Sequence, residues 1–244
     1  MKVIILEQKK EENIRFSEKF LLFGLSAKQI EKMLKSDDFD TKKVEIVISD
    51  ENGEPTVELI SPEQRHLTKI RKKFLTVFAD HILFAPNRTL AEAFFETLDK
   101  KGFQVSTAES VTGGMIASRI LDQPGASKIL KEAFVVYSNK AKIDLLGINP
   151  ETIEKNGVVS PAVAAEMAER LQKISEANVT IATTGIAGPD GGTKEIPVGT
   201  VFFGFLIDGK QKIEKRTFLG DRNEIRKKAS AYALAYVIDF LKTK

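Results

Sequence analysis

The stretch Gln104-Val105-Ser106-Thr107-Ala108-Glu109-Ser110-Val111-Thr112-Gly113-Gly114-Met115 decides the fold of this chain of 244 residues. Its first four residues, Gln104–Thr107, predict a short strand, and a helix is predicted from the two glycines to about Leu121. A strand that turns directly into a helix is the unit of an open α/β sheet, in which ligands bind at the carboxyl ends of the strands. Residues 108–114 are therefore a candidate functional loop.

The chain beyond residue 88 continues this alternation of strands and helices. We expect helices at 90–100, 140–146, 160–175 and 222–241, and strands at 133–137, 179–183, 198–207 and 212–218. Strands separated by helices predict a sheet that is covered on both faces. Asp208-Gly209 predicts a hairpin between the last two strands, so the sheet is expected to be mixed. The predicted fold class is α/β, a three-layer α/β/α domain over residues 88–244.

Residues 1–87 predict a separate, small α+β domain. Strands are expected at 3–6, 16–23, 44–48 and 57–59, and helices at 26–34 and 61–78. Ser26 is a typical helix N-cap residue, and Asn52-Gly53 is a hairpin turn signal. Phe84-Ala85-Pro86-Asn87 breaks the pattern and sets the boundary between the two domains.

The scarcity of histidine and cysteine restricts the chemistry. The chain has no cysteine, and its two histidines, His66 and His81, both lie in the first domain. A Ser-His-Asp triad, a Cys-His pair and a thiolate or histidine metal site are therefore excluded from residues 88–244. The two histidines have no cysteine nearby, so no metal site is predicted in the first domain either.

Charge and hydropathy argue against nucleic acid and membrane as partners. Residues 1–87 hold 15 basic and 15 acidic residues, and the net charge of +3 lies entirely in residues 88–244. Neither part has the basic stripe of a protein that binds phosphate backbones. No apolar run approaches the ~18 residues of a membrane span, and the run at 3–6 is too short for a signal peptide, so we expect a cytoplasmic protein.

A second glycine-rich loop follows the predicted strand at 179–183. It reads Thr183-Thr184-Gly185-Ile186-Ala187-Gly188-Pro189-Asp190-Gly191-Gly192-Thr193. So many glycines are costly unless the backbone bends sharply or approaches another group closely. Neither loop contains a Walker A or a Gly-x-Gly-x-x-Gly sequence, so no standard nucleotide cofactor is predicted. Composition alone leaves open that both loops are tight turns.

Ser110 is the candidate nucleophile, although a serine at this place is also an ordinary helix N-cap. A serine nucleophile needs a base, and without histidine a lysine or a tyrosine has to serve. Tyr137-Ser138-Asn139-Lys140-Ala141-Lys142 follows the next predicted strand, at the same edge of a parallel sheet as Ser110. A lysine that is neutral near pH 7 needs its pKa lowered by about 3 units, through burial or a nearby cation such as Lys140. Taken alone, Lys142 is read as a solvated helix lysine.

Five motifs in order carry a resemblance to a known family: Ala108-Glu109-Ser110-x-Thr112-Gly113-Gly114, Tyr137-Ser138-Asn139-x-Ala141-Lys142, Gly185-Ile186-Ala187-Gly188-Pro189-Asp190-Gly191-Gly192, Pro197-Val198-Gly199-Thr200-Val201 and Gly220-Asp221-Arg222. Together they resemble the CinA C-terminal family, whose enzymatic members are nicotinamide-nucleotide amidases. Residues 1–87 resemble, less closely, the KH-like middle domain of full-length CinA proteins. The large N-terminal domain of those proteins, similar to molybdopterin-biosynthesis proteins, has no counterpart in this sequence.

The resemblance implies an amidohydrolase that converts nicotinamide mononucleotide to nicotinate mononucleotide and ammonia, with no metal or cofactor. It implies Ser110 as the nucleophile and Lys142 as the base, assisted by Tyr137. Backbone N–H groups around 112–114 would stabilise the oxyanion. The substrate-binding residues that it implies are Glu109, Thr112, Gly113, Gly114, Thr184, Gly185, Gly188 and Arg222.

The residue that holds the 5′-phosphate of this substrate stays open. Arg222, alone or with Arg226, is the expected partner, because a guanidinium matches phosphate geometry. Arg119 and the start of the helix after Ser110 are the alternatives.

The first domain is not expected to bind nucleic acid. Residues 1–87 lack the Gly-x-x-Gly loop with which KH domains clamp nucleic acid, so we expect packing or dimerisation there and a homodimer as the assembly. The alternative function is a non-catalytic CinA-like interaction protein linked with competence or DNA damage. Retention of Ser110, Tyr137 and Lys142 argues for the enzyme.

Overall fold

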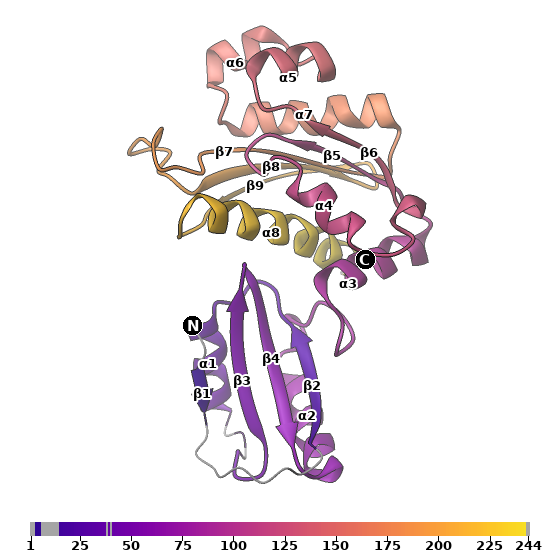
Figure 1. Ribbon diagram of the computed structural model, residues 1–244, viewed down its shortest axis with the longest axis vertical. Coiled ribbons are helices and arrows are strands. Elements are labelled where there is room, and N and C mark those ends of the chain that lie inside the picture. Colours follow the sequence, from indigo (N-terminus) through magenta and orange to yellow (C-terminus); the bar gives the residue numbers. More distant parts are fainter. Residues whose placement is uncertain (1–2, 6–14, 38, 40, 243–244) are drawn as a thin grey trace. The chain divides into compact units, whose positions relative to one another are not determined.

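A computed structural model describes residues 3–5, 15–37, 39 and 41–242 (Figure 1). The chain forms two compact units, one ending at Ala93 and the other running from Phe94 to Lys242. The division falls within helix α3 (Leu90–Lys101), shortly after the interruption at 84–87. Each unit has its own sheet and its own hydrophobic core. Among the helices of the described part, none combines the length and the apolar character that a membrane span requires.

The second unit is built on a five-stranded mixed sheet in the order β6-β5-β7-β8-β9. Its strands are β5 (Val105–Glu109), β6 (Leu130–Val135), β7 (Val179–Gly185), β8 (Thr200–Ile207) and β9 (Lys210–Thr217). β5 pairs in parallel with β6 and β7, and β8 pairs antiparallel with β7 and β9. The predicted mixed sheet and its C-terminal hairpin are confirmed.

Helices cover both faces of this sheet. They are α4 (Met115–Leu121), α5 (Asn139–Leu146), α6 (Pro150–Asn156), α7 (Pro161–Ser175) and α8 (Arg222–Lys242), with a 3-10 turn η1 (Ala126–Lys128). Figure 1 shows α7 against one face with α5 and α6 outside it, and α4 and α8 against the other face. The predicted three-layer α/β/α fold is therefore confirmed.

Helix α6 is absent from the sequence prediction. It has seven residues, none of them buried, so it shows no apolar periodicity. Its start is nevertheless signalled: Asn149 accepts the Glu151 N–H as N-cap, and Pro150 stands at the first helical position. Proline is favoured there because its missing N–H would have no partner inside the helix anyway.

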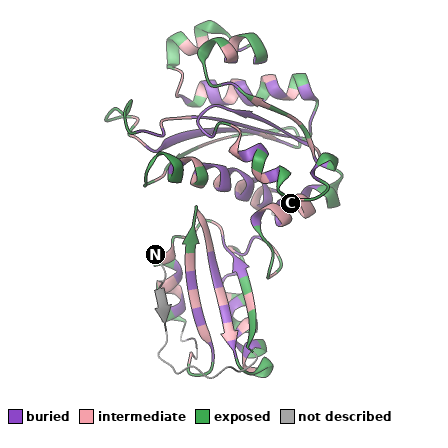
Figure 2. Cartoon of the chain, in the orientation of Figure 1, coloured by how far each residue is buried: buried purple, intermediate pink, exposed green. Residues whose placement is uncertain are grey.

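The central strands are buried and the two edge strands are not. β5, β7 and β8 are almost entirely buried, whereas every second residue of β6 and most of β9 are exposed (Figure 2). In the register of the parallel strands, Glu109 of β5 lies opposite Val135 of β6 and Thr183 of β7. The carboxyl ends of these three strands therefore meet at one edge of the sheet, and the candidate loops leave from there.

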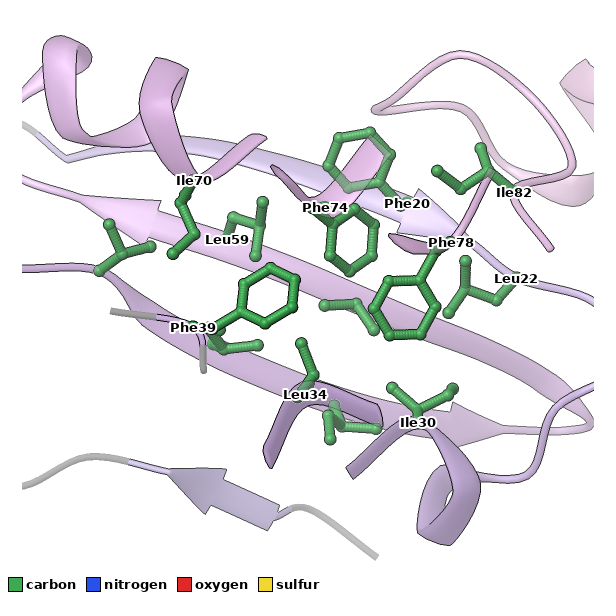
Figure 3. Packing of buried hydrophobic residues seen from close by; sticks show 14 of the residues in the cluster. Phe20, Leu22, Ile30, Leu34, Phe39, Leu59, Ile70, Phe74, Phe78 and Ile82 are labelled. Carbon is green, nitrogen blue, oxygen red and sulfur yellow. The ribbon is translucent and has the colours of Figure 1, made fainter. Parts of the chain in front are cut away.

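The first unit is a four-stranded antiparallel sheet in the order β1-β3-β4-β2, with two helices. Its elements are β1 (Val3–Ile5), β2 (Phe16–Leu21), α1 (Ala27–Ser36), β3 (Glu45–Glu51), β4 (Glu54–Ser61) and α2 (Gln64–Val77). Leu6, the end of the first predicted strand, lies outside the described residues. Figure 3 shows the core, where the rings of Phe74 and Phe78 stack 4.6 Å apart beside Phe20.

Local signals account for the start of α1 and for the β3–β4 turn. Ser26 is the N-cap of α1 and forms a capping box with Gln29, as a serine followed by glutamine three residues later predicts. Asn52 and Gly53 both have positive φ, of 57° and 82°, which is the conformation of a tight hairpin turn.

Candidate active site

Ser110 and Lys142 meet at the carboxyl edge of the sheet. Ser110 is the first residue after β5, and its backbone N–H donates to Thr183 O at 3.0 Å. Lys142 lies in the first turn of α5, which begins after the N-cap Ser138. The Lys142 Nζ is 3.0 Å from Ser110 Oγ and 2.9 Å from Val136 O. The fold thus brings a serine and a lysine 32 positions apart in the sequence into hydrogen-bond contact.

Burial controls the proton affinity of this lysine. Only 1% of Lys142 is exposed, and desolvation of the ammonium lowers its pKa from 10.5 to about 8. Lys140, whose ammonium is paired with Asp144, is not among the causes. At pH 7 about one Lys142 in ten is neutral, and at pH 9 most are.

The pair can perform nucleophilic chemistry. A neutral lysine amine keeps an N–H for Val136 O and has a lone pair that can accept the Ser110 hydroxyl proton. A hydroxyl beside a base is the arrangement that activates a serine nucleophile. No ion pair of the described residues includes Lys142, so no carboxylate holds it permanently as an ammonium.

The loop 110–114 is held in place by Glu109. This side chain is completely buried, and its carboxylate accepts the N–H groups of Gly114, Ile116 and Ala117 at 2.9, 3.0 and 2.9 Å. A carboxylate at this place is favourable because a helix N-terminus carries a partial positive charge. Glu109, which the sequence prediction assigns to the substrate, is therefore bound to the N-terminus of α4. The structure also shows that the α4 N-terminus, one alternative for the 5′-phosphate, already holds an anion.

Thr112, Gly113 and Gly114 contribute no side chain to the pocket. Thr112 Oγ1 lies 2.8 Å from Thr183 Oγ1, and Gly113 and Gly114 take positive φ angles of 58° and 92°. None of these three loop residues lines the pocket into which Ser110 and Lys142 point. Within the described part of the chain, the N–H groups of Val111, Thr112 and Gly113 donate no hydrogen bond. Of these three residues, Val111 lines the pocket, Gly113 is exposed and Thr112 is buried.

The second glycine-rich loop forms another wall of the site. Thr184 donates its hydroxyl to Val158 O at 2.8 Å, and Gly185 follows it at the end of β7. A Cβ on Gly185 would lie 2.6 Å from Thr200 O, so only glycine fits there. Gly188 contributes its carbonyl oxygen, which accepts a hydrogen bond from Arg222 Nη1 at 2.8 Å.

Tyr137 and Arg222 lie at the opening of the pocket. Tyr137 is 64% exposed, and its hydroxyl lies 3.1 Å from Arg222 Nη2. No hydrogen bond in the described part joins this hydroxyl to Ser110 or Lys142. The hydroxyl of Tyr137 is thus hydrogen-bonded to Arg222, while the residue itself lines the same pocket as Ser110 and Lys142.

These residues enclose a pocket of about 230 Å³. Of the predicted site residues, its lining includes Ser110, Tyr137, Lys142, Thr184, Gly185 and Arg222. The sequence prediction assigns no role to the other lining residues, Val111, Asn139, Val158, Val159 and Ala187. Asn139 has a signal, because it belongs to the Tyr-Ser-Asn motif. Val158 and Val159 have none, because they contribute only shape, from a loop brought in by the fold. No three His, Asp or Glu side chains gather as a metal site in the described residues.

All three arginines considered for the 5′-phosphate bind other groups of the protein. Arg119 donates to Ser230 Oγ at 2.8 Å, and Arg226 donates to Thr112 O at 3.0 Å. Arg222, which holds Gly188 O and Tyr137, is the one of the three that lines the pocket.

Comparison with known proteins identifies the family. Residues 87–241 match the family model of the CinA C-terminal domain. The chain belongs to the CinA family. A CinA-like protein of Petrotoga mobilis is 35% identical over 239 residues, which cover 96% of this chain and 57% of that protein. A CinA-like protein of Kosmotoga olearia is 40% identical over 171 residues, covering 70% of this chain and 42% of that protein. The chain thus spans about half the length of these curated relatives.

Solved CinA structures have the same fold. A CinA superfamily protein from Klebsiella pneumoniae matches with a TM-score of 0.61 and 30% identity, over 64% of this chain and 97% of that one. A competence/damage inducible protein from Agrobacterium tumefaciens matches with a TM-score of 0.60 and 39% identity, over 63% and 93%. The likeness of residues 1–87 to a KH domain stays a prediction.

Proposed function

We propose that this CinA-family chain is a serine–lysine amidohydrolase that deamidates nicotinamide mononucleotide. The observation that carries the proposal is the buried 3.0 Å contact between Lys142 Nζ and Ser110 Oγ. A buried amine without a carboxylate partner costs stability, and a protein that only binds partners gains nothing from it. A hydrolase gains a base from it, because the same burial lowers the pKa of Lys142 to about 8.

Acylation would begin with attack of Ser110 Oγ on the carboxamide carbon. The hydroxyl proton passes to neutral Lys142 Nζ, and the carbonyl oxygen becomes an oxyanion. The free N–H groups of Val111, Thr112 and Gly113 are the candidate donors to that oxyanion. Lys142 then returns the proton to the departing nitrogen, ammonia leaves, and an ester links Ser110 to the nicotinate nucleotide.

Deacylation would use the same groups. Lys142, neutral again after ammonia has left, takes a proton from water, which attacks the ester carbon. Collapse of the second tetrahedral intermediate breaks the bond to Ser110 Oγ, and Lys142 restores the serine proton. The products are nicotinate mononucleotide and free enzyme, so that one water is consumed for each ammonia released.

The choice of substrate rests on the family resemblance and on the opening of the pocket. A nicotinamide mononucleotide carries an anionic phosphate, and the exposed opening presents the Arg222 guanidinium with the Tyr137 hydroxyl beside it. A guanidinium is a good partner for phosphate oxygens. The amide would then point inward, toward Ser110 and Lys142.

Ammonia release from nicotinamide mononucleotide tests this function. We expect the wild-type chain and the S118A variant, which changes an exposed serine of α4, to release ammonia at the same rate. The S110A variant should lose at least ~10³-fold in rate while melting at the same temperature. Turnover by S110A at the wild-type rate would contradict the mechanism. A folded wild-type chain that releases no ammonia would instead favour the interaction protein suggested by the competence-damage names of its relatives.

A further inference from the structure

The first two turns of α8 support both glycine-containing loops of the site. Arg222, the first residue of α8, donates to Gly188 O of the second loop at 2.8 Å. Arg226, one turn later, donates to Thr112 O of the first loop at 3.0 Å. Residues four apart lie on the same side of a helix, so one helix end holds two loops that come from different strands.

Arg226 fits closely against the first loop. Arg226 is half-buried, and a Cβ on Gly113 would lie 3.1 Å from its Nη2. Gly113 also has a left-handed φ of 58°, which side chains rarely adopt. Glycine at this position therefore permits both the turn of the backbone and the approach of the guanidinium.

Arg226 is one of two groups that fix the direction of the Thr112–Gly113 peptide. In a planar trans peptide the C=O and the following N–H point in opposite directions. Since Thr112 O points at Arg226, the N–H of Gly113 points away from Arg226. Thr112 O also accepts the Met115 N–H at 3.3 Å, so this carbonyl is held both by the backbone of the loop and, at the shorter distance of 3.0 Å, by Arg226.

We propose that Arg226 is a positioning residue for amide hydrolysis, which orients the Thr112–Gly113 peptide so that the N–H groups of the loop receive the oxyanion. This inference rests on the proposed function. It gives α8 a role in supporting the first loop, in addition to carrying Arg222 at the pocket. Donors fixed in advance stabilise an oxyanion more than donors that must reorganise during the reaction. Arg226 touches neither the pocket nor the Ser110–Lys142 pair, so it acts through the loop.

The competing role for Arg226 is to bind the 5′-phosphate, and the two roles predict different kinetics. A positioning residue acts on the transition state, so its loss lowers kcat and leaves KM unchanged. The loss should also be the same for nicotinamide mononucleotide and for nicotinamide riboside, which has no phosphate. A phosphate ligand would instead raise KM for the mononucleotide only.

The experiment compares R226A, R226K and K227A, the last being an exposed lysine of the same helix as a control. For R226A we expect kcat to fall about 10- to 100-fold with both substrates, with KM unchanged within about twofold. Guanidinium ion should restore part of the lost rate, and R226K should lie between R226A and wild type, because an ammonium cannot reproduce the planar fork. K227A should behave as wild type. A KM effect restricted to the mononucleotide, or an unchanged kcat in R226A, overturns the proposal.

A readout independent of the nucleotide separates failure of this inference from failure of the proposed function. A fluorophosphonate probe reacts with an activated serine and develops negative charge on oxygen, so its labelling of Ser110 requires the same loop. We expect R226A to be labelled at least fivefold more slowly than wild type and to be rescued by guanidinium, whether or not the chain deamidates nicotinamide mononucleotide. Equal labelling rates in folded wild type and R226A overturn the proposal. If R226A does not fold, R226K gives the same comparison.

Discussion

The floor of the pocket, formed by Ser110 and Lys142, differs from its rim, formed by Tyr137 and Arg222. The floor is buried, with exposed fractions of 8% and 1%, whereas Tyr137 is 64% exposed and Arg222 faces solvent. In a buried site with little water, one polar contact changes a pKa or an interaction energy strongly. At a solvent-exposed site, water screens the same contact and its effect is small. Under the proposed function, the floor performs the chemistry and the rim selects and orients the ligand.

Removing the base should have the largest effect, and two lysines of α5 provide a matched pair. K142A removes the buried amine that contacts Ser110, and K140A removes an exposed amine paired with Asp144. We expect K142A to lose at least ~10³-fold in the rate of ammonia release, as loss of a catalytic base does. K140A should stay within about twofold of wild type. A similar loss in both variants would show that the floor has no special role.

Replacing the base with an apolar side chain should stabilise the protein. The Lys142 pKa is about 8 in the folded chain and 10.5 in the unfolded chain, so below pH 8 the folded state bears a cost of about 3 kcal/mol. Methionine removes this cost but leaves Val136 O without its partner, which costs about 1–3 kcal/mol. We expect K142M to be more stable than wild type by up to about 2 kcal/mol at pH 7 in urea unfolding.

The pH dependence of this gain provides its control. Between pH 8 and pH 10.5 the unfolded wild-type chain binds more protons at Lys142 than the folded chain, so wild-type stability rises with pH. The advantage of K142M should therefore disappear by about pH 10. A stability difference between K142M and wild type that is the same at pH 7 and pH 10 would contradict the assignment of a buried, destabilised ammonium.

A change at the rim should have the smallest effect. Y137F keeps the ring and removes the hydroxyl that lies 3.1 Å from Arg222. Since one exposed hydrogen bond is worth about 0.5–1.5 kcal/mol, we expect KM for nicotinamide mononucleotide to rise about 2- to 10-fold while kcat changes less. Steady-state kinetics give both constants. A drop in kcat as large as that of K142A would place Tyr137 in the proton transfer and remove the distinction between floor and rim.

Much of this fold follows from local sequence signals, and the site does so only in part. Ser26, Asn52-Gly53 and Asp208-Gly209 mark their cap and turns directly, whereas α6 lacks the apolar face from which a helix is recognised. The absence of histidine predicts a non-histidine base. Burial of Lys142, in contrast, depends on how α5 packs, and spacing along the chain does not contain that information.

The arginines and Glu109 show the same limit. Arginine and glutamate residues close to a glycine-rich loop in the sequence are predicted to contact a ligand, because these side chains bind phosphates and polar groups. In the structure, Glu109 caps α4 and Arg226 holds a loop carbonyl. The fold leaves some backbone N–H and C=O groups without backbone partners. Polar side chains near these groups bind them, and only the other polar side chains can face a ligand.

The pH dependence of kcat/KM for nicotinamide mononucleotide tests the central claim, that a buried lysine serves as the base, most directly. It should be measured from pH 7 to pH 9.5, above the phosphate pKa of about 6. Since only neutral Lys142 accepts the serine proton, and its pKa is about 8, kcat/KM should rise about tenfold and then level off, with its midpoint near pH 8. A profile that is flat or falls across this range would contradict Lys142 as the base.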